Sequence, residues 1–315
     1  MTMMNRTPLG IDETIVMDIN GSRQRVRMCA ARPGLPPMVI VQHGPGFPVL
    51  HEVAKFQRSL DLERDYLVVY WEQRGCGNAS AEDARRVSLA QQVEDLQAVI
   101  GWIADRTGQR VVVFGISLGA TVSLLAAARE PDRVTAVIAN SPDLHTQAAD
   151  DAVDRFLQDA VSRAGSSRLR RAVTKLGRPP YLDPQSFRQR AMLLTDLGSI
   201  ERGKTFLGAL RETVVAMLHS YGVVGTIRAF RNMSIVQRRM LPDMAPLDLF
   251  AHPPQLAVPV HFVFGERDAL TAAFMRSELP HAIGGPGTTA VRLPDAGHLV
   301  HFDRPDIVRT IAEHA

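Results

Sequence analysis

Short, continuous apolar runs recur along this chain, and stretches with helical spacing separate them. The runs MVIVQ, YLVVYWE and RVVVFG lie at residues 38–42, 66–72 and 110–115. A run without polar alternation is typical of a strand that is buried on both faces. Residues 85–105 place apolar side chains near helical spacing, which predicts a helix between the last two runs. Strands that alternate with helices in this way predict an α/β fold with a mostly parallel sheet.

The N-terminal segment differs, because polar and apolar residues alternate there. ETIVMDI and QRVRMCA show this alternation, and the dipeptide Asn20-Gly21 joins them. Asn-Gly tolerates the positive φ angles that a two-residue hairpin turn requires. We therefore expect an antiparallel hairpin at one edge of the sheet.

A long helical gap interrupts the later part of the predicted sheet. The strand-like run VTAVIAN precedes the gap, and VPVHFVFG and the weaker TTAVRLP follow it. The segments DDAVDRFLQDAVSR, QSFRQRAMLLTDL, KTFLGALRETVVAMLHSY and GTIRAFRNMSIVQRRML within the gap are helix-like. We therefore predict a core of residues 1–141 and 258–315, into which an all-helical cap of residues 142–257 is inserted.

Composition excludes several classes of protein. The 315 residues are 45% hydrophobic and carry a formal net charge of +3, with basic residues scattered along the chain. This pattern argues against binding to nucleic acid. The two cysteines, Cys29 and Cys76, are too few for a disulfide scaffold and match no metal-binding spacing. We find neither a signal peptide nor an apolar membrane span, so we expect a cytoplasmic protein without a membrane partner. No feature of the sequence indicates the oligomeric state.

Residues 115–119 read GISLG and fit the pattern G-x-S-x-G between a buried strand and a small-residue helix. A strand-to-helix turn this tight strains its central residue, and the flanking glycines leave space where side chains would clash. The turn would hold the Ser117 hydroxyl at the positive end of the helix, where an oxyanion is favoured. A serine that only caps the helix is the alternative. The surrounding strand and helix favour Ser117 as a nucleophile.

A serine nucleophile requires a base and an acid that orients the base. In this strand–turn–helix context the chain order is nucleophile, acid, histidine. Asp268 follows a strand-like run in FVFGERDAL, and His298 follows the last run in LPDAGHLVHFD. We therefore predict that Asp268 and His298 complete a triad with Ser117.

Each of these two residues has competitors nearby. Glu266 lies beside Asp268, but the G-x-x-D position belongs to Asp268. Asp295 is expected to shape its own turn. His301 lies where a helix begins and is expected to be a surface residue or one that supports the site. Asp268 and His298 are therefore preferred as acid and base.

Five motifs occur in the order PPMVIVQHGPG, YWEQRGCGNA, VFGISLGA, FVFGERD and AGH. As a set they resemble the α/β-hydrolase superfamily and, within it, the proline iminopeptidase family. The first resembles that family's HGGPG loop, and the second resembles its DQRGxGxS loop. The resemblance covers roughly residues 36–140 and 258–312. It implies an α/β-hydrolase fold, with helices on both sides of a mostly parallel sheet.

The resemblance also implies an oxyanion hole. The family's donors are the backbone N–H of the second glycine in HGGPG and that of the residue after the nucleophile. A gapless match places Gly44 and Leu118 at these positions, and Pro45 has no N–H to offer. Gln42 and His43 depart from the family's histidine and glycine.

Other motif residues have a structural interpretation beside a functional one. His43, Phe47 and Tyr221 are candidates for the substrate pocket, with loop or core packing as the alternative. Glu72 stands where the family has aspartate. Arg74 in the same motif is expected to hold its loop through an ion pair.

The charge of the predicted cap bears on the substrate. Iminopeptidases that resemble this chain bind the free α-amino group of the substrate through cap glutamates. Residues 142–258 hold 16 Lys and Arg against 11 Asp and Glu, and their only glutamates are Glu201 and Glu212. The family's glutamates therefore have no counterpart that we can match, and a neutral or acidic acyl substrate fits the charge better.

We expect a serine hydrolase that cleaves a small-molecule ester or amide through an acyl-enzyme intermediate, with no cofactor and no metal. One alternative is acyl transfer or intramolecular cyclisation on the same triad. The other is a small-molecule receptor that retains a hydrolase fold without catalysis.

Overall fold

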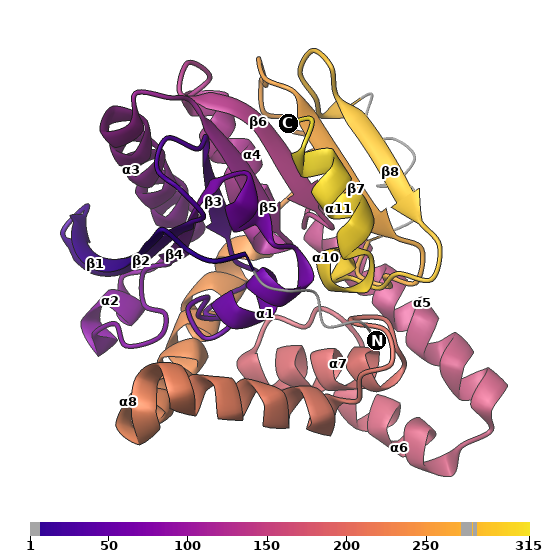
Figure 1. Ribbon diagram of the computed structural model, residues 1–315. Helices are drawn as coiled ribbons and strands as arrows, with labels where there is room; N and C mark the ends of the chain where they lie inside the picture. Colours follow the sequence, from indigo (N-terminus) through magenta and orange to yellow (C-terminus); the bar gives the residue numbers. More distant parts are fainter. Residues whose placement is uncertain (1–6, 272–278, 280–281) are drawn as a thin grey trace.

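The computed structural model describes residues 7–271, 279 and 282–315. Its centre is an eight-stranded sheet in the order β1-β2-β4-β3-β5-β6-β7-β8 (Figure 1). The strands are β1 (Ile11–Ile19), β2 (Ser22–Ala30), β3 (Pro37–Val41), β4 (Leu67–Glu72), β5 (Val111–Ile116), β6 (Val134–Asn140), β7 (Val260–Gly265) and β8 (Thr289–Leu293). The β1–β2 and β2–β4 pairs are antiparallel, and the other neighbouring pairs are parallel. The predicted α/β fold and N-terminal hairpin are confirmed.

Helices cover both faces of this sheet (Figure 1). In the core they are α1 (Val53–Ser59), η1 (Leu62–Arg64), α2 (Ala81–Arg85), α3 (Leu89–Thr107), α4 (Leu118–Arg129), α10 (Val300–Asp303) and α11 (Pro305–Ala312). Between β6 and β7 the chain forms α5 (Thr146–Ala164), α6 (Ser167–Leu176), α7 (Pro184–Asp196) and α8 (Phe206–Met244). Within the described ranges, none of these helices is both long enough and apolar enough to cross a bilayer.

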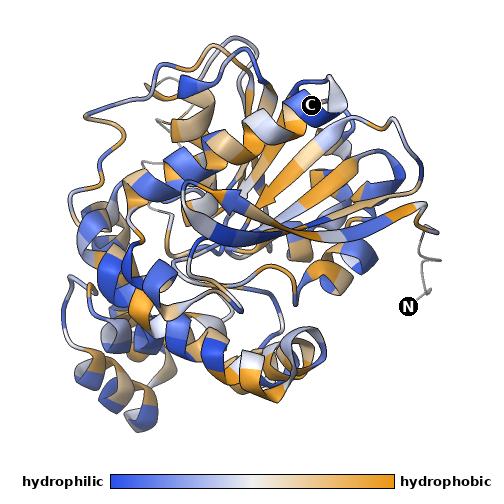
Figure 2. Cartoon of the chain, turned by 90° about the vertical axis from the view of Figure 1, so that its left-hand side faces the viewer, coloured by the Kyte–Doolittle hydropathy of each residue, from blue (hydrophilic) through white to orange (hydrophobic). Residues whose placement is uncertain are grey.

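The apolar core has two parts, one on each face of the sheet. Val39 and Val41 of β3 pack with residues of α3 and α4, whereas Met38 and Ile40 pack with residues of α1 and α11. Successive side chains of a strand point to opposite faces, so an unbroken apolar run can supply both layers. Figure 2 shows largely apolar strands at the centre, and helices around them in which hydrophilic and hydrophobic residues are mixed.

Two helix boundaries differ from the prediction. The helix expected at residues 85–105 is α3, which begins at Leu89 instead of Arg85 and ends at Thr107, because the separate helix α2 ends at Arg85. Ser88 starts α3: its Oγ accepts a hydrogen bond from the Gln91 N–H at 3.1 Å. Helix α6 was not among the expected segments. The last two expected segments are the two halves of α8, which Gly222 separates with non-helical backbone angles, as predicted.

Helices α5–α8 lie beyond the carboxyl ends of the strands (Figure 1). Two hydrogen bonds join α8 to the loop after β4. The Asn232 amide donates to the Ala79 carbonyl at 2.9 Å, and the Tyr221 hydroxyl donates to the buried Glu72 carboxylate. Burial raises the pKa of Glu72 to about 7, although the Tyr221 hydrogen bond acts in the opposite direction.

A buried ion pair holds the hairpin and the loop after β4 together. Arg74 Nε and Nη2 donate to the two Asp95 carboxylate oxygens at 2.7 and 2.9 Å. Arg74 also donates to the Ile19 and Asn20 carbonyls, and the Gln24 amide donates to Asp95. The prediction that Arg74 holds its loop through an ion pair is therefore confirmed.

We expect Asp95→Asn to lower the free energy of unfolding by about 3 kcal/mol, because Arg74 would keep its buried charge and lose the countercharge. Asp105→Asn on the same helix is the matched control. Asp105 is 73% exposed and lies 3.4 Å from Arg133, so its loss should cost under about 0.5 kcal/mol. Urea unfolding of the two variants and the parent protein measures the difference. Equal stability of the two variants would contradict this role of Asp95.

Candidate active site

Ser117 occupies a strained turn between β5 and α4. Its backbone angles are φ 55° and ψ −125°, and its side chain makes no capping hydrogen bond to the helix. The capping alternative for this serine is therefore wrong. A Cβ added to Gly115 or Gly119 would lie closer than 3.0 Å to backbone atoms of Ala120 or Val41, respectively. Glycine is required at both positions because neighbouring backbone atoms approach too closely for a side chain, as the sequence pattern predicts.

Asp268 and His298 come together at the carboxyl ends of β7 and β8. The distance between His298 Nδ1 and Asp268 Oδ2 is 2.9 Å, and both residues are buried. The Thr271 hydroxyl donates to the same Asp268 oxygen at 2.6 Å, and the Leu270 N–H donates to the other oxygen at 2.9 Å. The carboxylate is thus held in place and oriented toward the imidazole.

The two members of this pair shift each other's pKa. Burial alone would raise the pKa of Asp268, but the charge of His298 and its hydrogen bond lower it below the ordinary value. Burial alone would lower the pKa of His298, but the Asp268 carboxylate raises it above 6.5. The acid is therefore ionised at neutral pH, as a residue that orients and stabilises an imidazolium must be.

Asn140, the last residue of β6, connects the Ser117 turn to the His298 loop. The Ser117 N–H donates to the Asn140 carbonyl at 2.8 Å, and the Asn140 side-chain amide donates to the His298 carbonyl at 2.9 Å. Asn140 is fully buried. We did not predict this residue, because an asparagine at the end of a strand has no sequence signal that separates it from a turn former.

Ser199, in the segment between α7 and α8, supports the loops of both Asp268 and His298. Its carbonyl accepts a hydrogen bond from the His298 N–H at 2.9 Å, and its hydroxyl accepts one from the Ala269 N–H at 2.9 Å. The Ile200 carbonyl accepts from the Leu299 N–H in the same way at 2.8 Å. A segment of the predicted cap therefore helps to build the site.

The competing residues lie elsewhere. Glu266 and Asp295 are exposed, and Asp295 has φ 59° in a turn. His301 is buried, so of its two expected places the surface is wrong, whereas its contact with Asn140 fits a residue that supports the site. Its Nδ1 lies 3.2 Å from Asn140 Oδ1, and its ring stacks on Phe56 at 5.4 Å between centroids. Burial holds the pKa of His301 well below 6.5, which suits a neutral packing residue.

Gly44 and Leu118, the predicted oxyanion donors, lie next to each other. A Cβ added to Gly44 would be 3.4 Å from the Leu118 side chain. Leu118 is the first residue of α4, where a backbone N–H has no acceptor within its own helix. Among the described residues, neither N–H donates a hydrogen bond. Both donors are therefore available to a ligand.

The three pocket candidates have different surroundings. His43 and Phe47 pack against each other with ring centroids 4.8 Å apart, and His43 Nδ1 is buried without a partner in the described part of the chain. Burial lowers the pKa of His43 to about 4, so its ring is neutral. Tyr221 is buried, and its hydroxyl is already bonded to Glu72. His43 and Phe47 therefore remain candidates that a substrate could contact, whereas the Tyr221 hydroxyl is occupied.

Asp143, which follows β6, is a carboxylate that sequence reasoning missed. The Ser117 hydroxyl lies 3.3 Å from Asp143 Oδ2. Burial raises the pKa of Asp143, and the charge of His298 acts in the opposite direction. No basic side chain lies within ion-pair distance of Asp143 in the described ranges. The signal that could have identified it is its position just after a predicted strand, at the same sheet edge as Ser117.

Comparison with known proteins places this site in a family. Residues 38–310 match the family model described as Alpha/beta hydrolase family. The protein called "Probable aminopeptidase YbaC" from Bacillus subtilis (strain 168) is 21% identical over 305 residues, covering 95% of each chain.

Solved structures share the fold over nearly the whole chain. Proline iminopeptidase from Mycobacterium smegmatis has 18% identity and a TM-score of 0.65, with 96% of this chain and 97% of that chain covered. The proline iminopeptidase-related protein from Thermus thermophilus has 19% identity and a TM-score of 0.62, with 96% of each chain covered. The resemblance indicated by the five motifs is therefore confirmed, and the chain belongs to the alpha/beta hydrolase family.

Proposed function

We propose that this protein is a serine hydrolase that cleaves a small ester or amide with Ser117, His298 and Asp268 as its triad. The observation that carries the proposal is the buried pair of Asp268 and His298, 2.9 Å apart, at the same sheet edge as the strained Ser117 turn. Asn140 joins the backbone of the serine turn to that of the histidine loop. The family membership supports the same chemistry.

The proposed reaction has two steps. His298 takes the proton of the Ser117 hydroxyl, and the oxygen attacks the substrate carbonyl to form a tetrahedral intermediate. The N–H groups of Gly44 and Leu118 stabilise the oxyanion, and His298 then donates its proton to the leaving alcohol or amine. Water, deprotonated by His298, attacks the acyl-enzyme and releases the acid. Asp268 holds the imidazole and stabilises its charged form throughout.

We also propose that helices α5–α8 act as a cap over this edge of the sheet. Their place beyond the carboxyl ends of the strands supports this assignment (Figure 1). In α/β sheets, ligands bind outside the carboxyl ends of the strands. The cap would limit the size of the acyl group that reaches Ser117 and exclude water from the intermediate.

Within this chemistry, Asp143 favours amide substrates that carry an ammonium group next to the scissile carbonyl, in contrast to the neutral or acidic acyl substrate expected from the charge of the predicted cap. A partly buried carboxylate 3.3 Å from the nucleophile, without a basic partner in the described ranges, is suited to pair with such a cation. Asp143 would thus perform the task for which the cap offers no matching glutamate. The relative from Bacillus subtilis, whose name reads aminopeptidase, supports this preference.

Ser117→Ala should abolish labelling by a fluorophosphonate probe and reduce ester hydrolysis by at least about 1000-fold, because no other group can form the acyl-enzyme. Mass spectrometry of the labelled protein identifies the modified residue. Ser162→Ala, an exposed serine on α5, is the control and should label like the parent protein. Labelling at another residue would overturn the assignment of Ser117. Formation of mostly the transfer product in the presence of a competing alcohol would contradict hydrolysis.

The pH profile of kcat/KM should rise through an apparent pKa above 6.5, because only neutral His298 can act as the base and Asp268 raises its pKa. Asp268→Asn should move this limb to lower pH, since burial would then dominate, and should lower the rate by about 10⁴-fold. Glu266→Gln should leave both the limb and the rate unchanged. If the rising part of the pH profile lay at the same pH in Asp268→Asn as in the parent protein, the proposed pairing of Asp268 with His298 would be contradicted.

Asp143→Asn should raise KM about tenfold for an amino-acid p-nitroanilide with a free amine, because the ammonium group would lose its countercharge. KM for the N-acetylated p-nitroanilide should change by less than about twofold, since that substrate carries no cation. Asp151→Asn on α5 controls for the loss of a carboxylate. Equal effects on the two substrates would contradict a role for Asp143 in amine recognition and leave the serine mechanism unaffected.

A further inference from the structure

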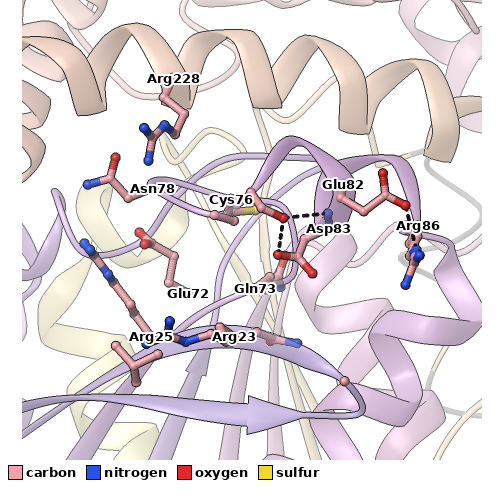
Figure 3. Close-up of a pocket in the computed structure, with 15 residues that line it drawn as sticks. Arg23, Arg25, Glu72, Gln73, Cys76, Asn78, Glu82, Asp83, Arg86 and Arg228 are labelled. Carbon is pink, nitrogen blue, oxygen red and sulfur yellow. Dashed lines mark hydrogen bonds and ion pairs between the residues drawn. The ribbon is translucent and has the colours of Figure 1, made fainter.

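A cavity of about 520 Å³ lies between β2, the loop after β4, α2 and α8 (Figure 3). Its lining contains none of Ser117, Asp268 and His298. Core residues form its floor and one wall, and Arg228 of α8 lies on the opposite side from Arg25 (Figure 3). The cavity is therefore separate from the proposed catalytic groups and lies where the core meets the last helix of the predicted cap.

Four arginines from three different elements line this cavity. Arg23 and Arg25 lie two residues apart on β2, so their side chains share one face of the strand. Arg86 comes from the end of α2 and Arg228 from α8. In the described part of the chain, only Arg86 among the four forms an ion pair, at 2.9 Å from Glu82.

The acidic residues of the lining are already engaged. Glu82 pairs with Arg86, and the Ser80 hydroxyl donates to Asp83 at 2.6 Å. Glu72 accepts the Tyr221 hydroxyl, and although the charge of Arg25 acts on it, the two side chains form no ion pair. The guanidinium groups of Arg23, Arg25 and Arg228 are therefore left without a direct carboxylate partner among the described residues.

Asn78 provides a second, independent feature of the cavity. Its Oδ1 is buried and has no hydrogen-bond partner among the described residues. The side chain lies against α8, where a Cβ added to Gly225 would be 2.7 Å from Asn78 Oδ1. Because this oxygen faces α8 and is buried, Asn78 contributes to the wall of the cavity next to that helix.

We propose that this cavity binds a small multivalent oxyanion, which joins Arg23 and Arg25 of the core to Arg228 of α8. Three carboxylates also line the cavity, but in the described part of the chain none forms an ion pair with Arg23, Arg25 or Arg228, so these guanidinium groups can bind an added anion. Guanidinium groups match the oxygens of phosphate and carboxylate with paired N–H donors. Binding would connect the core to α8 without involving Ser117.

Isothermal titration with pyrophosphate and, separately, with citrate tests the site at constant ionic strength. Saturable binding of either anion is expected, and the tighter of the two identifies phosphate or carboxylate as the preferred group. Arg25→Gln and Arg228→Gln should each weaken binding about tenfold. Arg211→Gln, an exposed arginine on the first half of α8, is the matched control and should bind like the parent protein.

Two further measurements make the result decisive. Melting curves without anion should be alike for all variants, because the substituted side chains form no ion pair in the described ranges. Ser117→Ala should bind the anion as the parent does, which separates this site from the catalytic proposal. Absence of saturable binding by both anions would overturn the proposal. If Arg211→Gln weakened anion binding as much as Arg25→Gln and Arg228→Gln, the proposal would also be overturned, because the loss would then reflect only the change in net charge.

Discussion

The close approach of α4 to the end of β3 is the constraint on which the site depends. Because Gly119 has no side chain, the first turn of α4 packs directly on the backbone carbonyls of Val41 and Gln42. This contact places the free N–H of Leu118 beside the loop that holds Gly44. A larger residue at position 119 would move the helix away from the strand. The Ser117 turn and the Leu118 N–H would then move away from Gly44, so the two proposed oxyanion donors would no longer lie next to each other.

The sequence could predict those features that depend on local pattern. Buried parallel strands appear as apolar runs, Asn20-Gly21 marks the hairpin, and the ends of two such runs locate Asp268 and His298. Local pattern also explains one error. The apolar residues at helical spacing begin only at Leu89, so the expected start at residue 85 went beyond the pattern, and the Ser88 cap marks the true start.

Features that depend on contacts between distant segments could not be predicted. Asn140 bonds to a loop 158 residues away, and Ser199 bonds to the loop of Asp268 from a different layer of the molecule. Each is an ordinary polar residue in its own sequence context. Asp143 is a similar case, because its carboxylate becomes notable only when the fold places it 3.3 Å from the Ser117 hydroxyl. Burial gives these groups their significance, since a buried polar atom needs a partner.

Helices α5–α8 contact the core at several places, and two of these contacts have different consequences. At Ser199 and Ile200, backbone hydrogen bonds hold the His298 loop, so a displacement of this segment would disturb the acid and base themselves. At α8, the contacts run instead to the loop after β4, through Tyr221 and Asn232. The first attachment therefore holds the loops of the proposed acid and base, and the second holds α8 against the core. The kink at Gly222 and one side of the arginine-lined cavity both lie on that helix, so an anion bound in the cavity would strengthen the second attachment and not the first.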